Sequence, residues 1–126
     1  REWEFAARGG EKGRLYPWGD KFIGRNAVFG LSPDRGSPKA VGRHAGGASL
    51  HGAEDMAGNA WEWVEDPFRS RLDSPSPYSR KGVVYRTLRG GSWINGRWGL
   101  ANSSRTGDRP DRRLSVYGFR CAVSLP

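Results

Sequence analysis

Apolar residues along the chain occur in short clusters, separated by long polar stretches that are rich in glycine and proline. Residues 1–8 place apolar side chains at helical spacing and lead into a glycine pair, which predicts a short helix that ends at glycine. Trp61 and Trp63 flank Glu62, so an extended backbone there presents both tryptophans on one face and the carboxylate on the other. The pattern therefore predicts a helix near the start of the chain and a strand near its middle.

Two later segments have the composition of strands, and the connections between the predicted elements are long. Residues 83–93 end in a strand-like run and a glycine turn, and residues 116–125 are expected to form a closing strand. Residues 24–52 are predicted to form a long ordered loop, and residues 67–82 a polar surface excursion rich in serine and proline. Residues 94–117, in contrast, follow neither a helical period nor a strand alternation, although patterned residues flank them on both sides.

The composition indicates one domain over residues 1–126 with a small core. Six Trp, five Phe and four Tyr supply much of the expected burial, and no apolar run approaches the length of a membrane span. The single cysteine, Cys121, is interpreted as a small core residue of the closing strand. His44 and His51 lie seven residues apart with no carboxylate at metal-binding spacing, so they are interpreted as solvated loop residues.

Charge is distributed unevenly along the chain, which carries a net charge of +8. Residues 1–66 have nine Lys/Arg and ten Asp/Glu, whereas residues 67–126 have twelve and three, so the second half alone carries +9. A basic half makes nucleic acid a legitimate candidate partner. The arginines are dispersed instead of clustered, however, so we expect no nucleic-acid binding near physiological salt.

Five motifs in this order resemble the sulfatase-modifying-factor family, the formylglycine-generating-enzyme-like domains: "EWEFAARGG", "YPWGD", "DMAGNAWEWVED", "LRGGSW" and "GFRCA". The resemblance implies an α+β, C-type-lectin-like fold with a small twisted antiparallel sheet and long packed loops. It also implies that Trp61, Trp63, Trp93 and Phe119 are buried, and that the family's N-terminal strand and helix start are missing here.

The family's founding activity oxidises a substrate cysteine with two active-site thiols that hold copper. The resemblance places those thiols at Asn95 and Leu100 of this chain, and neither residue can bind copper as a thiolate. The chain is therefore not expected to be an enzyme. The alternative to a binding protein is an ordinary domain of the family that is inactive or acts together with a partner domain.

Within the family, the chain resembles the variable proteins of diversity-generating retroelements, in which error-prone copying at adenines diversifies Asn codons on a fixed scaffold. The resemblance implies a variable ligand-binding segment over residues 94–117. It assigns ligand binding to Ile94, Asn95, Gly96, Ser104, Thr106, Asp108, Arg109, Arg112, Leu114, Ser115 and Val116.

The residue types in this segment agree with such a mechanism. Substituting adenines in an Asn codon never produces Lys, Glu, Gln, Met or Trp, and residues 94–117 contain no Lys, Glu, Gln or Met. Trp98 is the exception and would be a fixed scaffold residue. An ordinary surface of a family member with its own partner is the competing interpretation.

The expected partner is a protein or other macromolecule that the sequence does not name. No cofactor is required, although members of the family often bind Ca²⁺ through loop oxygens. Candidate calcium ligands are Asn26 and Asp34 for one site and Glu62 for another. No signal peptide is visible, and the sequence assigns no compartment.

Overall fold

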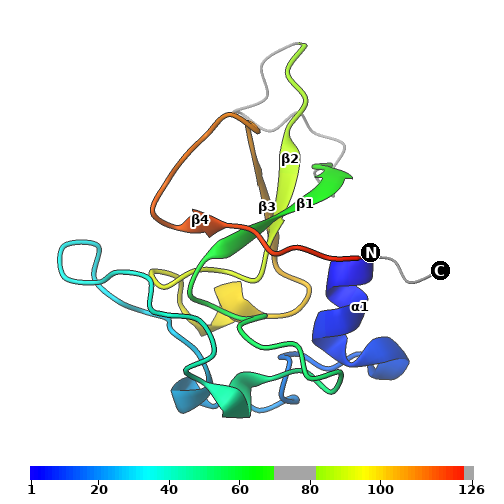
Figure 1. The fold of residues 1–126 in the computed structure, drawn as a ribbon, viewed down its shortest axis with the longest axis vertical. Coiled ribbons are helices and arrows are strands. Elements are labelled where there is room, and N and C mark those ends of the chain that lie inside the picture. The colour runs from blue at the N-terminus through cyan, green and yellow to red at the C-terminus, as the bar shows by residue number, and fades with distance from the viewer. Residues whose placement is uncertain (70–81, 124–126) are drawn as a thin grey trace.

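The computed structural model describes residues 1–69 and 82–123. Figure 1 shows a small sheet at the top of the view, irregular loops below it, and the helix α1 (Glu2–Arg8) at one side. Short 3₁₀ turns punctuate the loops at Gly10–Lys12, Gly24–Asn26, Ala45–Gly47 and Arg97–Leu100. Most of the excursion predicted over residues 67–82 lies outside the described residues.

The sheet contains four short strands in the order β3-β2-β1-β4. They are β1 (Trp61–Pro67), β2 (Arg86–Arg89), β3 (Arg105–Asp108) and β4 (Tyr117–Gly118). β1 pairs with β2 and β2 with β3 in antiparallel fashion, as the expected fold class requires, whereas β4 runs parallel to β1. The small curled sheet with few helices confirms the predicted α+β, C-type-lectin-like class.

β1 forms where the tryptophan alternation predicts a strand. Trp61 is 9% exposed and Trp63 is half-buried on one face. Glu62 faces the other way and is nevertheless buried, because α1 and the chain after β4 cover that face. The Nε1 of Trp3 donates to the Glu62 carboxylate at 2.6 Å, so the helix is attached to the sheet through a side chain of β1.

Two glycines allow the loops to pass close to one another under the sheet. Gly58 has a φ of 78°, and a Cβ there would lie 2.3 Å from the carbonyl oxygen of Val28. Gly91 has a φ of 75°, and a Cβ would lie 2.6 Å from the carbonyl oxygen of Gly99. A side chain at either position would require the facing backbone to move.

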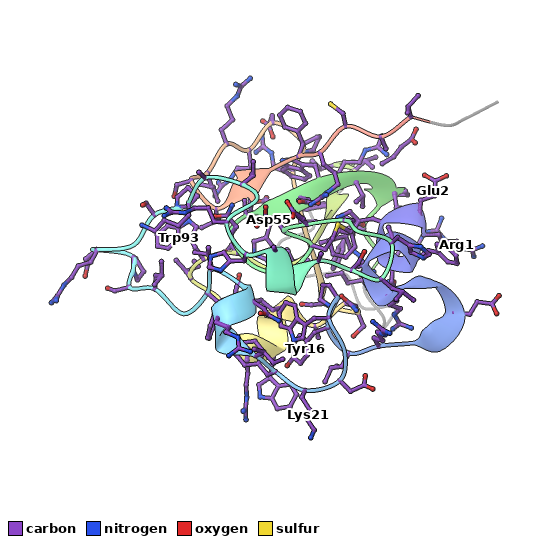
Figure 2. The ribbon with its side chains drawn as sticks, turned by 60° about the horizontal axis from the view of Figure 1, so that its bottom comes forward. Arg1, Glu2, Tyr16, Lys21, Asp55 and Trp93 are labelled. Atoms are coloured by element: carbon purple, nitrogen blue, oxygen red, sulfur yellow. The ribbon has the colours of Figure 1, made fainter. Side chains whose placement is uncertain are left out.

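The core lies among the loops below the sheet. Tyr16 and Leu100 are fully buried at its centre and pack with small residues from three loop segments. Aromatic rings extend it: Tyr16 stacks on Trp18 at 5.4 Å and meets Phe22 edge-on at 5.2 Å. In Figure 2, Tyr16 lies well below the sheet, on the side away from the C-terminal segment. The aromatic residues thus provide the burial that the composition predicted.

The expected closing strand is shorter than predicted, and two residues assigned to the interior are exposed. Only Tyr117 and Gly118 pair with β1, after which residues 119–123 have no strand partner among the described residues. Phe119 is consequently 77% exposed and Cys121 is exposed, so the prediction that both are buried is wrong. Their apolar character suits a strand, but a strand buries its side chains only where a neighbour covers it.

Within residues 1–69 and 82–123, no helix combines the length and apolar content needed to cross a membrane.

Candidate recognition surface

The recognition surface is defined here as the eleven predicted ligand-binding positions, which lie on two segments, residues 94–96 and 104–116. The first segment follows the glycine turn after β2. Asn95 closes this turn, because its Oδ1 accepts hydrogen bonds from the backbone N–H of Ser92 at 2.8 Å and from the Ser92 hydroxyl at 2.7 Å. Ile94 and Gly96 are left exposed on either side of Asn95.

The turn is held against a neighbouring loop by its backbone. The backbone N–H of Gly30 donates to the carbonyl of Asn95 at 2.9 Å, and that of Leu31 donates to the carbonyl of Trp93 at 2.8 Å. Trp93 itself is 4% exposed, so its ring fixes the turn to the body of the protein. Figure 2 places Trp93 on the side of the molecule away from Arg1 and α1.

The second segment begins at β3, whose register determines where its side chains lie. Thr106 pairs with Leu88, and Asp108 with Arg86. Because paired residues of a ladder share a face, Thr106 and Asp108 lie on the same face of the sheet as Leu88. Both are partly exposed there.

Tyr117 of β4 bridges back to β3 through Asp108. Its hydroxyl donates to Oδ2 of Asp108 at 2.8 Å, and its ring meets Trp63 edge-on at 5.4 Å. Burial, followed by the hydrogen bond to Asp108, raises the pKa of Tyr117 to about 12. Since β3 and β4 are the two edge strands, this bond ties the outer edges of the curled sheet together.

Residues 109–116 form the loop between these edges, here called the Arg loop. The backbone N–H of Arg109 donates to Oδ1 of Asp108 at 2.8 Å, and the Arg109 guanidinium binds both oxygens of Asp111. This pairing lowers the pKa of the Asp111 carboxyl and raises that of Arg109. The backbone N–H of Arg112 donates to the carbonyl of Arg109 at 3.0 Å, which closes a turn at the tip.

The end of the Arg loop returns to Trp93, where the two segments of the surface meet. The indole Nε1 of Trp93 donates to the carbonyl oxygen of Ser115 at 3.3 Å. The backbone N–H of Trp61 donates to the carbonyl oxygen of Val116 at 2.8 Å. Leu114 and Ser115 are exposed beside this junction. Residues 94–96 and 114–116 are therefore brought together by one buried tryptophan.

None of the eleven positions is buried, but they are not equivalent. Asn95 and Asp108 already use their side chains to hold the surface together. Ser104 lies at the far end of β3 from Asp108, and its carbonyl accepts a hydrogen bond from buried Arg89 at 3.2 Å. Gly96 has a φ of −73° and open space around a Cβ, so nothing in its surroundings requires glycine.

Two exposed features next to the surface were not predicted as binding residues. Trp98 is 66% exposed, and the Arg97 guanidinium lies 4.9 Å from the centre of its ring. Arg113 is exposed in the Arg loop. The polar sequence around Trp98 gives no period from which its exposure could be inferred.

The candidate calcium ligands have different surroundings. Both oxygens of Glu62 accept from the Arg120 guanidinium at 2.7 Å, so a cation occupies the position that Ca²⁺ would need, and Glu62 does not fit a metal site. Asn26 is buried in a 3₁₀ turn, whereas Asp34 is exposed. No cluster of three or more His, Cys, Asp or Glu that could hold a metal occurs in the described part of the chain. A calcium site at Asn26 and Asp34 stays a prediction.

The positions that the resemblance equates with catalytic thiols serve structural roles. Asn95 closes the turn described above, and Leu100 is completely buried in the core. The histidines are likewise engaged locally, since Nδ1 of His44 lies 2.8 Å from the carbonyl of Arg25 and His51 stacks on Phe5. These residues give no arrangement for thiol or metal chemistry.

Known proteins of similar sequence include both active and inactive members of one family. The chain is 35% identical over 98% of its length to inactive C-alpha-formylglycine-generating enzyme 2 from Mus musculus, of which it spans 41%. It is 36% identical over 96% of its length to formylglycine-generating enzyme from Streptomyces coelicolor, of which it spans 44%.

Comparison of structures adds a third relative. Treponema denticola variable protein 1 superposes with a TM-score of 0.72 at 30% identity, over 94% of this chain and 43% of the other. The chain thus spans less than half the length of these relatives. The family model for the sulfatase-modifying factor enzyme 1-like domain matches residues 1–125, and the chain belongs to that family.

Proposed function

We propose that this chain is a ligand-binding variable protein of a diversity-generating retroelement, in which the recognition surface carries the diversified residues. The observation that carries the proposal is how the surface is held in place. Carbonyl oxygens of the surface accept the bonds that fix it to the fold at Asn95, Ser104, Ser115 and Val116. A carbonyl is present whatever the side chain, so the surface can keep its shape while side chains change at nine of its positions; Asn95 and Asp108, whose side chains help to hold it, are the exceptions.

The donors of these bonds lie outside the surface. They are backbone groups of Gly30 and Trp61 and side chains of Trp93 and Arg89; Gly30 is exposed, and the other three residues are buried. Exposed positions tolerate substitution far better than core positions do. The likeness to Treponema denticola variable protein 1 supports the same function.

The DNA around the gene tests the proposal. We expect a near-copy of the codons for residues 94–120 that has Asn codons at the surface positions and lies beside a reverse-transcriptase gene. Sequencing the surface codons in many cells of one lineage should show changes confined to the adenines of that copy. A gene that lacks the copy, or whose variation is spread evenly over its length, contradicts the proposal.

The competing function is that of an inactive domain of the family, and the identity to the mouse inactive enzyme favours it. On either view we expect no enzyme activity, because Asn95 and Leu100 supply no thiols. Incubation with copper and a cysteine-containing substrate peptide, followed by mass spectrometry, should show no aldehyde product above the buffer control. The Streptomyces coelicolor enzyme is the positive control.

A further inference from the structure

The Arg loop carries more cationic groups than its own carboxylates neutralise. Arg109 is paired with Asp111 through two hydrogen bonds. The Nε of Arg112 lies 3.7 Å from Oδ2 of Asp108, too far for a hydrogen bond, and this side chain is 54% exposed. Arg113 is exposed and makes no ion pair or hydrogen bond with any residue that the structure describes. The Arg113 guanidinium is thus unpaired among the described residues, and that of Arg112 is held only by a long, exposed ion pair with Asp108, which a partner's carboxylate could replace.

These two groups are presented by a backbone that is already ordered. The turn at the tip, the hydrogen bond between Tyr117 and Asp108, and the attachment of Ser115 to Trp93 hold the loop at both ends. Exposed Leu114 follows directly in the chain and adds an apolar contact. A preordered site with arginine beside an apolar side chain has the composition of a protein interface.

We propose that the partner bound through the Arg loop is an acidic polypeptide segment whose Asp or Glu carboxylates pair with Arg112 and Arg113. The proposal rests on the function proposed above and names the chemistry of its ligand. A guanidinium binds a carboxylate through two parallel hydrogen bonds, so each of these arginines can hold one side chain of the partner. Arg109, which is already paired in this way with Asp111, shows the geometry within the same loop.

Two carboxylates, one in the loop and one at the end of β3, favour this partner over nucleic acid. Asp111 pairs with Arg109 and Asp108 with Arg112, and both acids would repel a continuous row of phosphates. Separate carboxylates spaced along a peptide can bind Arg113, which pairs with neither acid, and can compete with Asp108 for Arg112. Charge complementarity at such a site sets which partner is accepted.

Binding of labelled poly-L-glutamate and of a DNA duplex to the whole chain, near physiological salt, tests the proposal. The variant Arg112→Gln/Arg113→Gln removes the two guanidinium groups, and Arg1→Gln/Lys21→Gln removes two exposed cations that lie away from Trp93 in Figure 2, with the same loss of charge. We expect the first variant to weaken poly-L-glutamate binding about tenfold or more, since bonds to charged groups are strong, and the second to change it less than about twofold. Arg112→Lys/Arg113→Lys should fall between the two, because lysine keeps the charge and loses the paired geometry.

Three results would overturn the proposal: no poly-L-glutamate binding by the parent, equal losses in the two Gln variants, or tighter binding of DNA than of poly-L-glutamate. Equal losses would show that only net charge matters, and preference for DNA would assign a nucleic-acid partner. Thermal unfolding of each variant confirms that it is folded. Because the genomic test of the proposed function does not depend on ligand chemistry, failure of one proposal is distinguishable from failure of the other.

Discussion

Trp93 is the residue on which both segments of the recognition surface depend. It is 4% exposed, and its indole holds Ser115 while its backbone holds Leu31. Replacing Trp93 with Ala should lower the free energy of unfolding by roughly 3–5 kcal/mol, because the cavity cannot close in a loop-built core. Urea unfolding followed by circular dichroism measures this change.

Phe119 provides a matched control for that measurement. The sequence predicted that it is buried, yet it is 77% exposed, so Phe119→Ala should change the free energy of unfolding by less than about 0.5 kcal/mol. If both variants lost the same free energy of unfolding, Phe119 would be buried in solution, contrary to the structure.

Tyr117 predicts a pH dependence of stability. Its pKa is raised from 10.0 to about 12, chiefly by burial and then by the hydrogen bond to Asp108. A raised pKa means that the protonated phenol favours the folded state, so the contribution is complete below pH 10 and is lost as pH rises toward 12. Tyr117→Phe should abolish this alkaline loss.

Absorbance near the ionised-tyrosine band follows the same group directly. The parent should show a titration near pH 12 that belongs to Tyr117 and that disappears in Tyr117→Phe. Asp108→Ala should move this titration toward lower pH, because it removes the hydrogen bond and the negative charge that oppose ionisation. A titration that is unchanged in Asp108→Ala would mean that the bond between the sheet edges does not form.

At the scale of elements, the sequence predicted the strands that have a buried face and missed the one that does not. β1 follows from the alternation of Trp61 and Trp63. β3 contains only polar residues and Gly107, so no alternation of apolar and polar residues predicts a strand there. It is a strand because it pairs with β2 and because Phe68 packs where a Cβ on Gly107 would lie. Pairing between segments that are far apart in the sequence cannot be inferred from the local hydrophobic periodicity.

The same limit applies to the site. Which positions are exposed follows from a resemblance, but which side chains hold the surface together follows only from three-dimensional contacts. The resemblance assigns Asp108 and not Asp111 to ligand binding, but it does not reveal that the Asp108 side chain binds Tyr117 or that the Asp111 side chain binds Arg109. The exposure of Phe119 and Cys121 was mispredicted for a related reason, since burial of an edge segment depends on what lies beside it.

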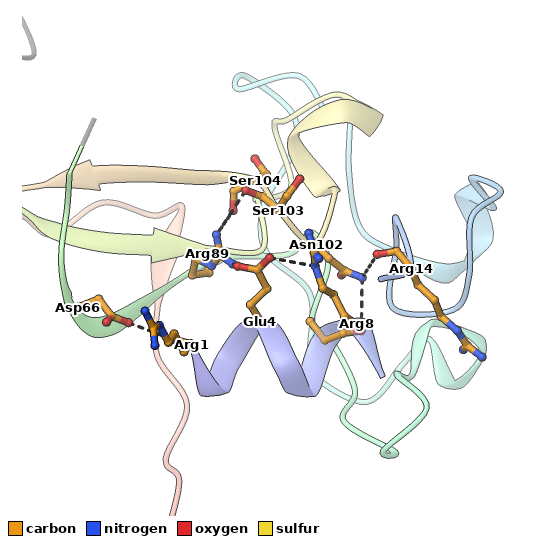
Figure 3. A network of polar contacts seen from close by, with 10 residues as sticks. Arg1, Glu4, Arg8, Arg14, Asp66, Arg89, Asn102, Ser103 and Ser104 are labelled. Carbon is orange, nitrogen blue, oxygen red and sulfur yellow. Dashed lines mark hydrogen bonds and ion pairs between the residues drawn. The ribbon is translucent and has the colours of Figure 1, made fainter. Parts of the chain in front are cut away.

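Because α1 is attached to the sheet, we expect its two glutamates, Glu2 and Glu4, to contribute unequally to the stability of the fold. Figure 3 shows Glu4 between Arg8 and Arg89, and the side chain of Arg89 is only 7% exposed. Glu4→Ala leaves this buried guanidinium without its carboxylate and should cost on the order of 2–3 kcal/mol, less than for a fully buried pair because Glu4 is itself 34% exposed. Burial acts to lower the pKa of Arg89, and Glu4 opposes that effect.

Exposed Glu2 in the same helix is the control, since Glu2→Ala changes the same residue type at a solvent position. It should cost no more than a few tenths of a kcal/mol, the contribution of one charge near a helix end. Thermal unfolding measures the loss of stability in both variants. Equal losses would mean that Arg89 is in contact with solvent.

At the scale of the molecule, one family includes proteins with different roles, among them an active and an inactive enzyme. This chain has Asn95 and Leu100 where the resemblance to the family's founding enzyme places two thiols. The basic half of the chain supplies the Arg loop, while Arg89 and Arg120 from the same half are committed to Glu4 and Glu62. Net charge alone therefore describes the function poorly.

A further variant tests whether the fold tolerates changes across the recognition surface. It places Asn, the residue that the proposed template would encode, at the surface positions whose side chains do not hold the surface together. This variant keeps Asn95 and Asp108 and replaces Ile94, Gly96, Ser104, Thr106, Arg109, Arg112, Leu114, Ser115 and Val116. It should still unfold cooperatively, because exposed substitutions each cost within about half a kcal/mol, and it should lose poly-L-glutamate binding.

The paired variant Asn95→Ala/Asp108→Ala changes only two side chains and should destabilise the fold by about 2–4 kcal/mol. It leaves the buried amide and hydroxyl of Ser92 and the phenol of Tyr117 without their acceptors. Calorimetry of both variants compares them under one condition. If the nine-residue variant unfolds while the two-residue variant is as stable as the parent, side chains and not carbonyl oxygens hold the surface, and the basis for a freely variable binding site is lost.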